Sequence, residues 1–358
     1  MGMIQELRGI RPVRNVQAGQ WLEDFLVAAI AAILVIRVYL ELTGYPQVGG
    51  KGLHIAHMLW GGLFMLVAII LLVAFLGRDV VRLGAILGGL GFGVFIDELG
   101  KFITSDNNYF FRPTFALIYV IFIVLFLAFR WIDRRRTPTE QEALVNAVNI
   151  LIEVVRHDLD AHEKEEALAL LRQSDPSNPI VAPLTRLLEE ATPLPAGRPP
   201  LPVRIARAAH AFYRHVIAFP WFARALIVLF IVIAVADVIS LIGTIVDDAG
   251  FHWQSPDISV VESADTITTG LFAGLILAGI TQLRRSRLVA YRWFRRAMLV
   301  AIFFGQVFSF YSEQLLAVIG LTINLLLLGA LTYTIRDEEE EIAAKSAAPV
   351  QAGVMRDA

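Results

Sequence analysis

The chain has 358 residues, of which 56% are hydrophobic and only 18% are charged, and its net charge is −2. With a mean hydropathy of +0.63, this composition excludes an ordinary soluble domain, in which about a quarter of the residues are charged. The absence of cysteine excludes disulfides, thiolate metal sites and cysteine nucleophiles. The first 20 residues lack the apolar core of a signal peptide, so we expect no cleaved leader.

Eight apolar segments predict an all-α, polytopic membrane bundle. They cover residues 22–42, 54–76, 83–104, 113–131, 223–246, 264–283, 294–312 and 315–334. Each has about the length that spans a bilayer core, and the bilayer offers no hydrogen-bond partners, so the segments should be helices. Arginine is concentrated before the first span and after the second, fourth and sixth spans. The positive-inside rule therefore places both termini in the cytoplasm.

Residues 133–202 interrupt the apolar pattern and predict a small helical insert on the cytoplasmic side. Its first segment has the period of an amphipathic helix, with Leu144, Val148, Leu151 and Val155 on one face. Two shorter helical segments and a proline-rich linker, residues 192–202, follow. The insert carries no catalytic motif, so we expect it to pack on the bundle or to bind a protein partner.

Two further segments flank the second group of spans. Residues 203–219 place Arg204, Arg207 and Arg214 beside apolar residues, which is typical of a helix that lies on a membrane surface. Because this segment adjoins a span, we expect it to bind anionic lipids of the inner leaflet and not nucleic acid. The acidic and alanine-rich residues 337–358 predict a disordered tail.

The insert divides the spans into two groups of four, residues 1–132 and 203–336. Gly62-Leu63-Phe64 of the second span matches Gly270-Leu271-Phe272 of the sixth. With an even number of spans in each group, the two halves would have the same orientation, so we expect a parallel 4+4 repeat. In this register several polar positions coincide: His54 with Glu262, His57 with Asp265, Arg37 with Asp237 and Lys101 with Glu313.

The third span poses the main chemical question, because it carries Asp97, Glu98 and Lys101 close to its outer end. Gly89 and Gly93 precede Asp97 at intervals of four residues and share its face. Glycine stripes allow helix backbones to approach closely, so this face should pack on other helices and not on lipid. Charges inside a membrane cost about 3 kcal/mol each on insertion scales, so these residues need partners.

Several pairings could satisfy the charges. Asp97 and Lys101 are four residues apart on one helix, and Arg37 could pair with Glu41 or with Asp237. Asn324 in the last span predicts an interhelical hydrogen bond. The predicted substrate- or ion-binding residues are Arg37, Asp97, Glu98, Lys101, Asp237 and Glu313, and the predicted metal ligands are His54, His57, Glu262 and Asp265.

The sequences HIAHMLWGGL, residues 54–63, and GFGVFIDELGKFITSDNNYFFRP, residues 91–113, resemble a set of bacterial multi-pass membrane proteins with no assigned activity. The resemblance covers the first four spans best. It implies about eight helices and a location in the bacterial inner membrane, and it supplies no reaction.

Three functions fit this pattern. An ion- or proton-coupled transporter would use the carboxylates as relays or cation ligands. A membrane-embedded enzyme could hold a divalent metal on histidine and carboxylate ligands and act on a lipid or lipid-linked substrate. A sensor or scaffold would pass a change in the outer cluster to the cytoplasmic insert. We favour transport because polytopic proteins with repeats most often transport.

Two cofactor classes are not expected. Histidines three residues apart on one helix cannot bind opposite faces of a haem. No P-loop or dinucleotide-binding glycine pattern is present.

Overall fold

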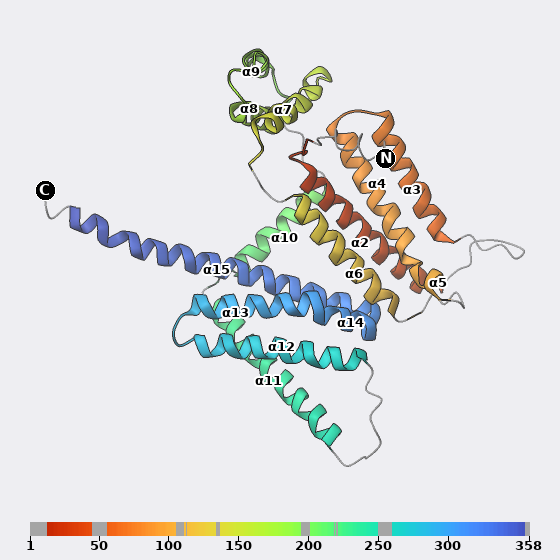
Figure 1. Ribbon diagram of the computed structural model, residues 1–358, viewed down its shortest axis with the longest axis vertical. Helices are drawn as coiled ribbons and strands as arrows, with labels where there is room; N and C mark the ends of the chain where they lie inside the picture. The colour runs from red at the N-terminus through yellow and green to blue at the C-terminus, as the bar shows by residue number, and fades with distance from the viewer. Residues whose placement is uncertain are drawn as a thin grey trace, which may run out of the picture. The chain divides into compact units, whose positions relative to one another are not determined.

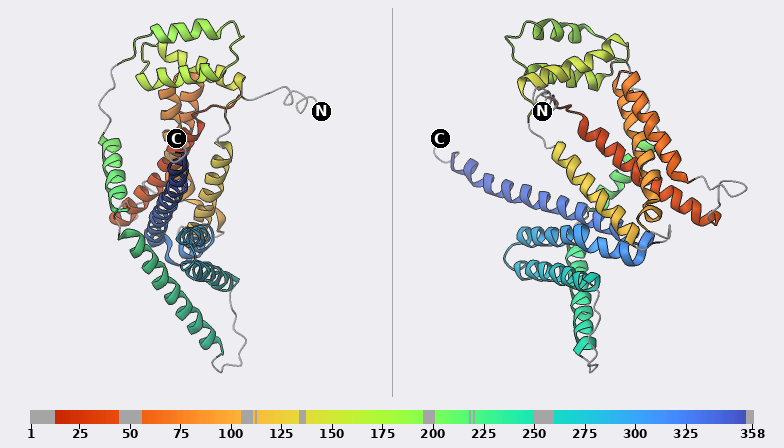
Figure 2. Two further views of the ribbon diagram at one scale, coloured as in Figure 1. Left: turned by 90° about the vertical axis from the view of Figure 1, so that its left-hand side faces the viewer. Right: turned by 45° about the vertical axis from the view of Figure 1, so that its right-hand side comes forward.

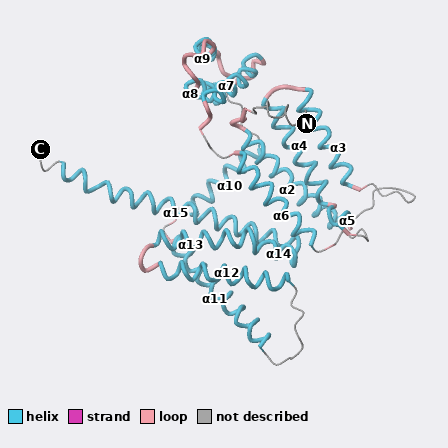
Figure 3. Tube along the Cα trace, in the orientation of Figure 1, coloured by secondary structure: helices cyan, strands magenta, loops and turns pink. Residues whose placement is uncertain are grey.

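The computed structural model describes residues 13–44, 56–104, 111, 113–133, 137–194, 201–217, 219, 221–249 and 260–354. Over these residues the chain is helical and contains no strand (Figure 3). Within the same ranges, six helical stretches are long and apolar enough to cross a membrane, or seven if a bent pair of helices is counted as one. The predicted all-α class is confirmed, and the helices have the character of a multi-pass membrane protein.

The chain folds as two units, and the boundary between them lies within helix α6. The first unit contains α2 (Ala18–Thr43), α3 (His57–Ala74), α4 (Arg78–Asp97), α5 (Leu99–Ile103), the second part of α6 (Pro113–Ile132), α7 (Glu140–Val155), α8 (Ala161–Gln173) and α9 (Val181–Glu190). The second contains the first part of α6, α10 (Leu201–Ile217), α11 (Phe222–Ala249), α12 (Val260–Gln282), α13 (Arg287–Val300), the π-helical turn η1 (Ala301–Gly305), α14 (Gln306–Glu313), the 3-10 turn η2 (Gln314–Leu316) and α15 (Ala317–Val354). Figure 1 labels the α-helices.

The glycines of α4 allow the three helices α2, α3 and α4 to pack backbone against backbone. A Cβ added at Gly89 would collide with the carbonyl oxygen of Phe25, and one at Gly93 with that of Ala29. On another face of α4, a Cβ at Gly91 would lie 2.6 Å from the carbonyl oxygen of Gly61 in α3. The predicted glycine stripe is therefore confirmed as a helix-packing surface.

These contacts fix the register of α2 against α4. Phe25 lies beside Gly89, and Ala29 lies beside Gly93, so the two helices are parallel and Asp97 is level with Ile33. A helical side chain covers the turn that precedes its own Cα. Arg37, one turn beyond Ile33, is therefore placed to reach back to Asp97.

The insert forms a small helical cluster within the first unit. Ala143, Ala147 and Ile150 of α7 are buried against residues of α8 and α9. Val148 and Val155 were predicted to share the apolar face with Leu144 and Leu151, yet they are 42% and 81% exposed. The buried face is shifted because small alanines let α8 approach closely at positions 143 and 147.

The second unit has its own core. The rings of Phe230 and Phe294 stack with centroids 4.9 Å apart, and Tyr291 and Leu331 are buried beside them. Helices α13 and α15 contact each other, and the chain turns between α14 and α15 at Gln314, which has a positive φ of 54°. Helix α15 continues to Val354, through residues whose composition predicts disorder.

We expect Gly93→Ala to destabilise the first unit by about 1–3 kcal/mol, because the added methyl group must push α4 away from the backbone of α2. Gly62→Ala is the matched control, since a Cβ at Gly62 meets no atom within 4 Å. Thermal unfolding of the purified protein in detergent measures both effects. Equal stability of the two variants would show that the close packing at Gly93 is unimportant.

Candidate functional site

A buried ion pair joins α2 to α4 near the ends of both helices. The Arg37 Nε donates to Oδ1 of Asp97, and Arg37 Nη2 donates to the main-chain oxygen of Asp97 at 2.9 Å. Asp97 is completely buried and Arg37 is only 4% exposed. Two donors of one guanidinium thus satisfy both the charge of Asp97 and a carbonyl at the end of α4.

The helix breaks at the next residue. Helix α4 ends at Asp97, Glu98 has φ −84° and ψ 7°, and α5 begins at Leu99. In a continuous α-helix, adjacent side chains point about 100° apart. The break at Glu98 changes the angle between the two adjacent side chains. Both Asp97 and Glu98 are completely buried.

Glu98 takes its partners from two directions. Its Oε2 accepts a hydrogen bond from the backbone N–H of Met58 at 3.1 Å, in the first turn of α3. The N-cap residue of α3, Ala56, supplies no capping side chain, so Glu98 caps α3 from the break between α4 and α5. Its Oε1 accepts from Lys101 Nζ, three residues further along the chain.

His57 lies between the two carboxylates. Its Nε2 is 3.1 Å from Asp97 Oδ2, and its Nδ1 is 3.5 Å from Glu98 Oε1. A neutral imidazole has only one N–H, whereas a protonated one donates from both nitrogens. Both ring nitrogens of His57, whose side chain is 20% exposed, face carboxylate oxygens.

The five side chains form one connected network of nearly balanced charge. Arg37 and Lys101 offset the two carboxylates, and His57 contributes a further positive charge only when it is protonated. The pairing of Arg37 with Asp97 was not proposed from the sequence. Lys101, expected to pair with Asp97, bonds to Glu98. The expectation that Glu98 needs another helix is met by the N–H of Met58.

The remaining predicted site residues either have no described side chain or belong to the second unit. His54 lies outside the described residues, and the side chains of Asp237 and Glu262 are likewise outside them although their backbones lie in α11 and α12. Asp265 and Glu313 lie in the second unit and have exposed side chains.

The described residues do not support the predicted metal site. Among them, no group of three or more histidine, aspartate or glutamate side chains is arranged to hold a metal ion. Both ring nitrogens of His57 face carboxylates. The metal ligand set, which includes residues outside the described ranges, stays a prediction.

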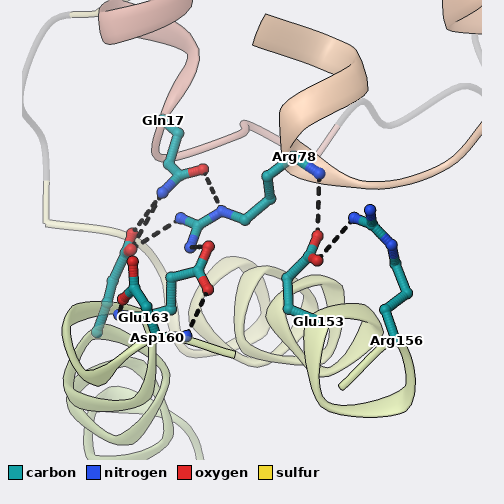
Figure 4. Close-up of polar contacts among 7 residues, drawn as sticks. Gln17, Arg78, Glu153, Arg156, Asp160 and Glu163 are labelled. Carbon is teal, nitrogen blue, oxygen red and sulfur yellow. Dashed lines mark hydrogen bonds and ion pairs between the residues drawn. The ribbon is translucent and has the colours of Figure 1, made fainter. Parts of the chain in front are cut away.

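A second charged network, at the opposite ends of α2 and α4, was missed in the sequence (Figure 4). Arg78, the first residue of α4, donates to Gln17, to Glu163 at 3.1 Å and to Glu166 at 2.8 Å. Its backbone N–H donates to Glu153 of α7 at 3.0 Å. One arginine therefore fixes the insert to the beginning of α4. This contact agrees with the prediction that the insert packs on the bundle.

At this junction, opposing effects act on the pKa of Glu163. Burial raises the pKa of Glu163, while hydrogen bonding from Asp160 and the charge of Arg78 oppose that shift. Glu153 is 2% exposed and also accepts from Arg156 at 2.8 Å. A sequence signal existed in the acidic residues of α8, but their partner, Arg78, is distant in the chain and reads as an ordinary positive-inside residue.

The second unit contains an uncharged polar group. Gln306, which is 3% exposed, donates to the carbonyl oxygen of Ala317 at 2.7 Å and accepts from Asn324 at 3.2 Å. The predicted interhelical hydrogen bond of Asn324 is confirmed. The Tyr119 hydroxyl donates to the carbonyl oxygen of Ile302 in the π-helical turn η1, a class of helix distortion that recurs at functional sites.

No protein-family model, no curated protein and no solved structure matches this chain.

We expect Arg37→Gln and Asp97→Asn each to destabilise the first unit by about 3–5 kcal/mol, because each leaves a buried charge without its partner. The double variant should cost less than the sum of the single variants, since it removes both charges. Asp24→Asn, in the exposed pair with Arg82, is the control and should change the stability by less than about 1 kcal/mol. Unfolding measured in detergent gives the cycle, and strict additivity would contradict the pairing.

Proposed function

We propose that this chain is a multi-pass protein of the bacterial cytoplasmic membrane that couples proton binding at His57, Asp97 and Glu98 to the transport of an ion or solute. The observation that carries the proposal is the position of His57 between two fully buried carboxylates. Ionisable groups inside membrane proteins are expensive and mark proton or ion pathways.

The chemistry of the network supports proton exchange in particular. Histidine is the side chain that ordinarily gains or loses a proton near neutral pH. Arg37 and Lys101 already offset the charges of Asp97 and Glu98, so a proton on His57 changes the net charge of the buried network. A proton on Glu98 would in turn weaken its hydrogen bond to Met58 and so free the beginning of α3.

The proposal includes eight membrane crossings, with both termini in the cytoplasm and a parallel repeat of four spans. In its support, helices make up most of the described residues of each of the eight apolar segments. The stretch 287–340, which counts as one candidate span, contains two helices that pack against each other, α13 and α15. The arginine distribution supports the orientation.

Proton uptake into proteoliposomes tests this function. We expect the wild-type protein to carry protons down an imposed gradient, and Asp97→Asn and His57→Gln to abolish the flux because the acceptor network is removed. Asp24→Asn is the matched control, since it makes the same chemical change in an exposed ion pair. Normal flux in both site variants, each shown to be folded, would refute the proposal.

A second candidate, a membrane sensor, is favoured by the docking of the insert. Arg78 and Gln17 join the insert to the beginnings of α4 and α2, and the network of His57 joins the other ends of the same two helices. A change of charge at one end could therefore alter the packing at the other.

Hydrogen exchange of residues 137–194 distinguishes the two functions. A sensor predicts that acidifying the medium on the His57 side changes exchange in the insert, and that His57→Gln removes this response. Arg78→Ala should raise exchange in the insert at every pH, whereas Arg82→Ala, a change in the exposed pair with Asp24, should not. If hydrogen exchange in the insert does not depend on His57, the sensor function is refuted and the transport function is unaffected.

A further inference from the structure

We propose that the exposed apolar face of α7 is a contact between two copies of this chain in the same membrane. The face consists of Val145, Val148, Ile152 and Val155. The three valines are 44%, 42% and 81% exposed, although the opposite face of the same helix is fully packed. Contiguous apolar surface outside the membrane-spanning helices marks an interaction site.

The spacing of the four residues is that of a helix–helix seam. Their intervals are three, four and three residues, which is the a/d pattern of two successive heptads. All four side chains are β-branched, a stiff shape that suits knobs-into-holes packing. The seam does not compete with the internal contacts of α7, since Ala143, Ala147 and Ile150 lie on its buried side.

The charges beside the seam disfavour a lipid surface as its occupant. Glu140 and Glu142 belong to α7, and the basic residue that directly follows the helix, Arg156, already pairs with the buried Glu153. Helices that lie on anionic leaflets instead carry lysine and arginine on their polar face. A protein surface with the same apolar spacing is the better complement, and a second copy of α7 provides one.

The docking contacts give the direction of α7 in the first unit. Asn146 accepts from the backbone N–H of Val16, just before α2, and Glu153 accepts from that of Arg78 at the beginning of α4. These two positions are seven residues apart, or about 10 Å along the helix, which matches the separation of two packed helices. Helix α7 therefore lies across the ends of α2 and α4, as Figure 2 shows.

This direction decides how two copies can meet. Two copies inserted the same way into one membrane are related by a two-fold axis along the membrane normal. A helix that lies across the membrane helices meets its symmetry mate antiparallel around such an axis. The α7 seams then pair Val145 with Val155 of the other copy, and Val148 with Ile152 of the other copy.

The polar residues that flank the seam are complementary in this antiparallel register. Asn149, which is exposed, falls beside the two-fold axis and faces Asn149 of the other copy. Glu142, which also accepts from Thr139 in the capping box, faces Arg156 of the other copy, which also pairs with Glu153, and the symmetry repeats this contact between opposite charges. A parallel pair would instead place like residues opposite each other along the whole seam, with glutamate against glutamate.

Cysteine cross-linking in native membranes tests the contact, because the chain has no cysteine of its own. We expect Asn149→Cys to form a disulfide-linked dimer on mild oxidation, since its two copies meet at the axis. Glu190→Cys, at an exposed position of α9, is the control and should remain monomeric. Adding Val148→Glu to Asn149→Cys should abolish the cross-link, while adding Leu187→Glu, also at an exposed apolar position, should leave it unchanged.

Both glutamates replace exposed side chains, and the hydrogen exchange of residues 137–194 checks that the insert stays folded. The proposal is overturned if Asn149→Cys gives no homodimer, if it cross-links no better than Glu190→Cys, or if Val148→Glu has no effect. A cross-linked product with the mass of a different protein would also overturn it, because the occupant would then not be a second copy.

Discussion

The first unit depends on one constraint: Asp97 and Glu98 are buried where water cannot solvate them, so every charge must be met by a neighbouring helix. Arg37 meets Asp97, and Lys101 with the N–H of Met58 meets Glu98. This is possible only because Gly89 and Gly93 bring α4 against the backbone of α2. Side chains at those positions would separate the helices and leave the Asp97 charge uncompensated.

The same packing places two polar networks on one rigid pair of helices. The network of His57 joins the ends of α2 and α4, and that of Arg78 joins their beginnings to the insert. Between them the contact is glycine against backbone, which leaves little room for independent sliding of either helix. A shift of α4 against α2 would therefore disturb both networks together.

Much of the first unit was predictable from the sequence because the signals are local. The apolar lengths predict the helices, and the four-residue spacing of Gly89, Gly93 and Asp97 predicts a packed face that ends in a charge. The partner of Asp97 was not predictable, since it depends on the register of α2, which only the backbone contacts at Phe25 and Ala29 define. A periodic pattern also could not reveal which face of α7 is buried, because both faces are apolar.

Because both faces of α7 are apolar, this helix could transmit a change at the His57 network to a partner of the insert. Coupling between two sites is reciprocal. If a change in α2 and α4 alters the docking of the insert, then a partner that binds the insert alters the equilibrium between the states of α2 and α4. If α7 pairs with a second copy, the docked position of α7 contributes to the stability of the dimer. Protonation at His57, docking through Arg78 and pairing along Val148 would then be three equilibria that act on one helix pair, each able to bias the other two.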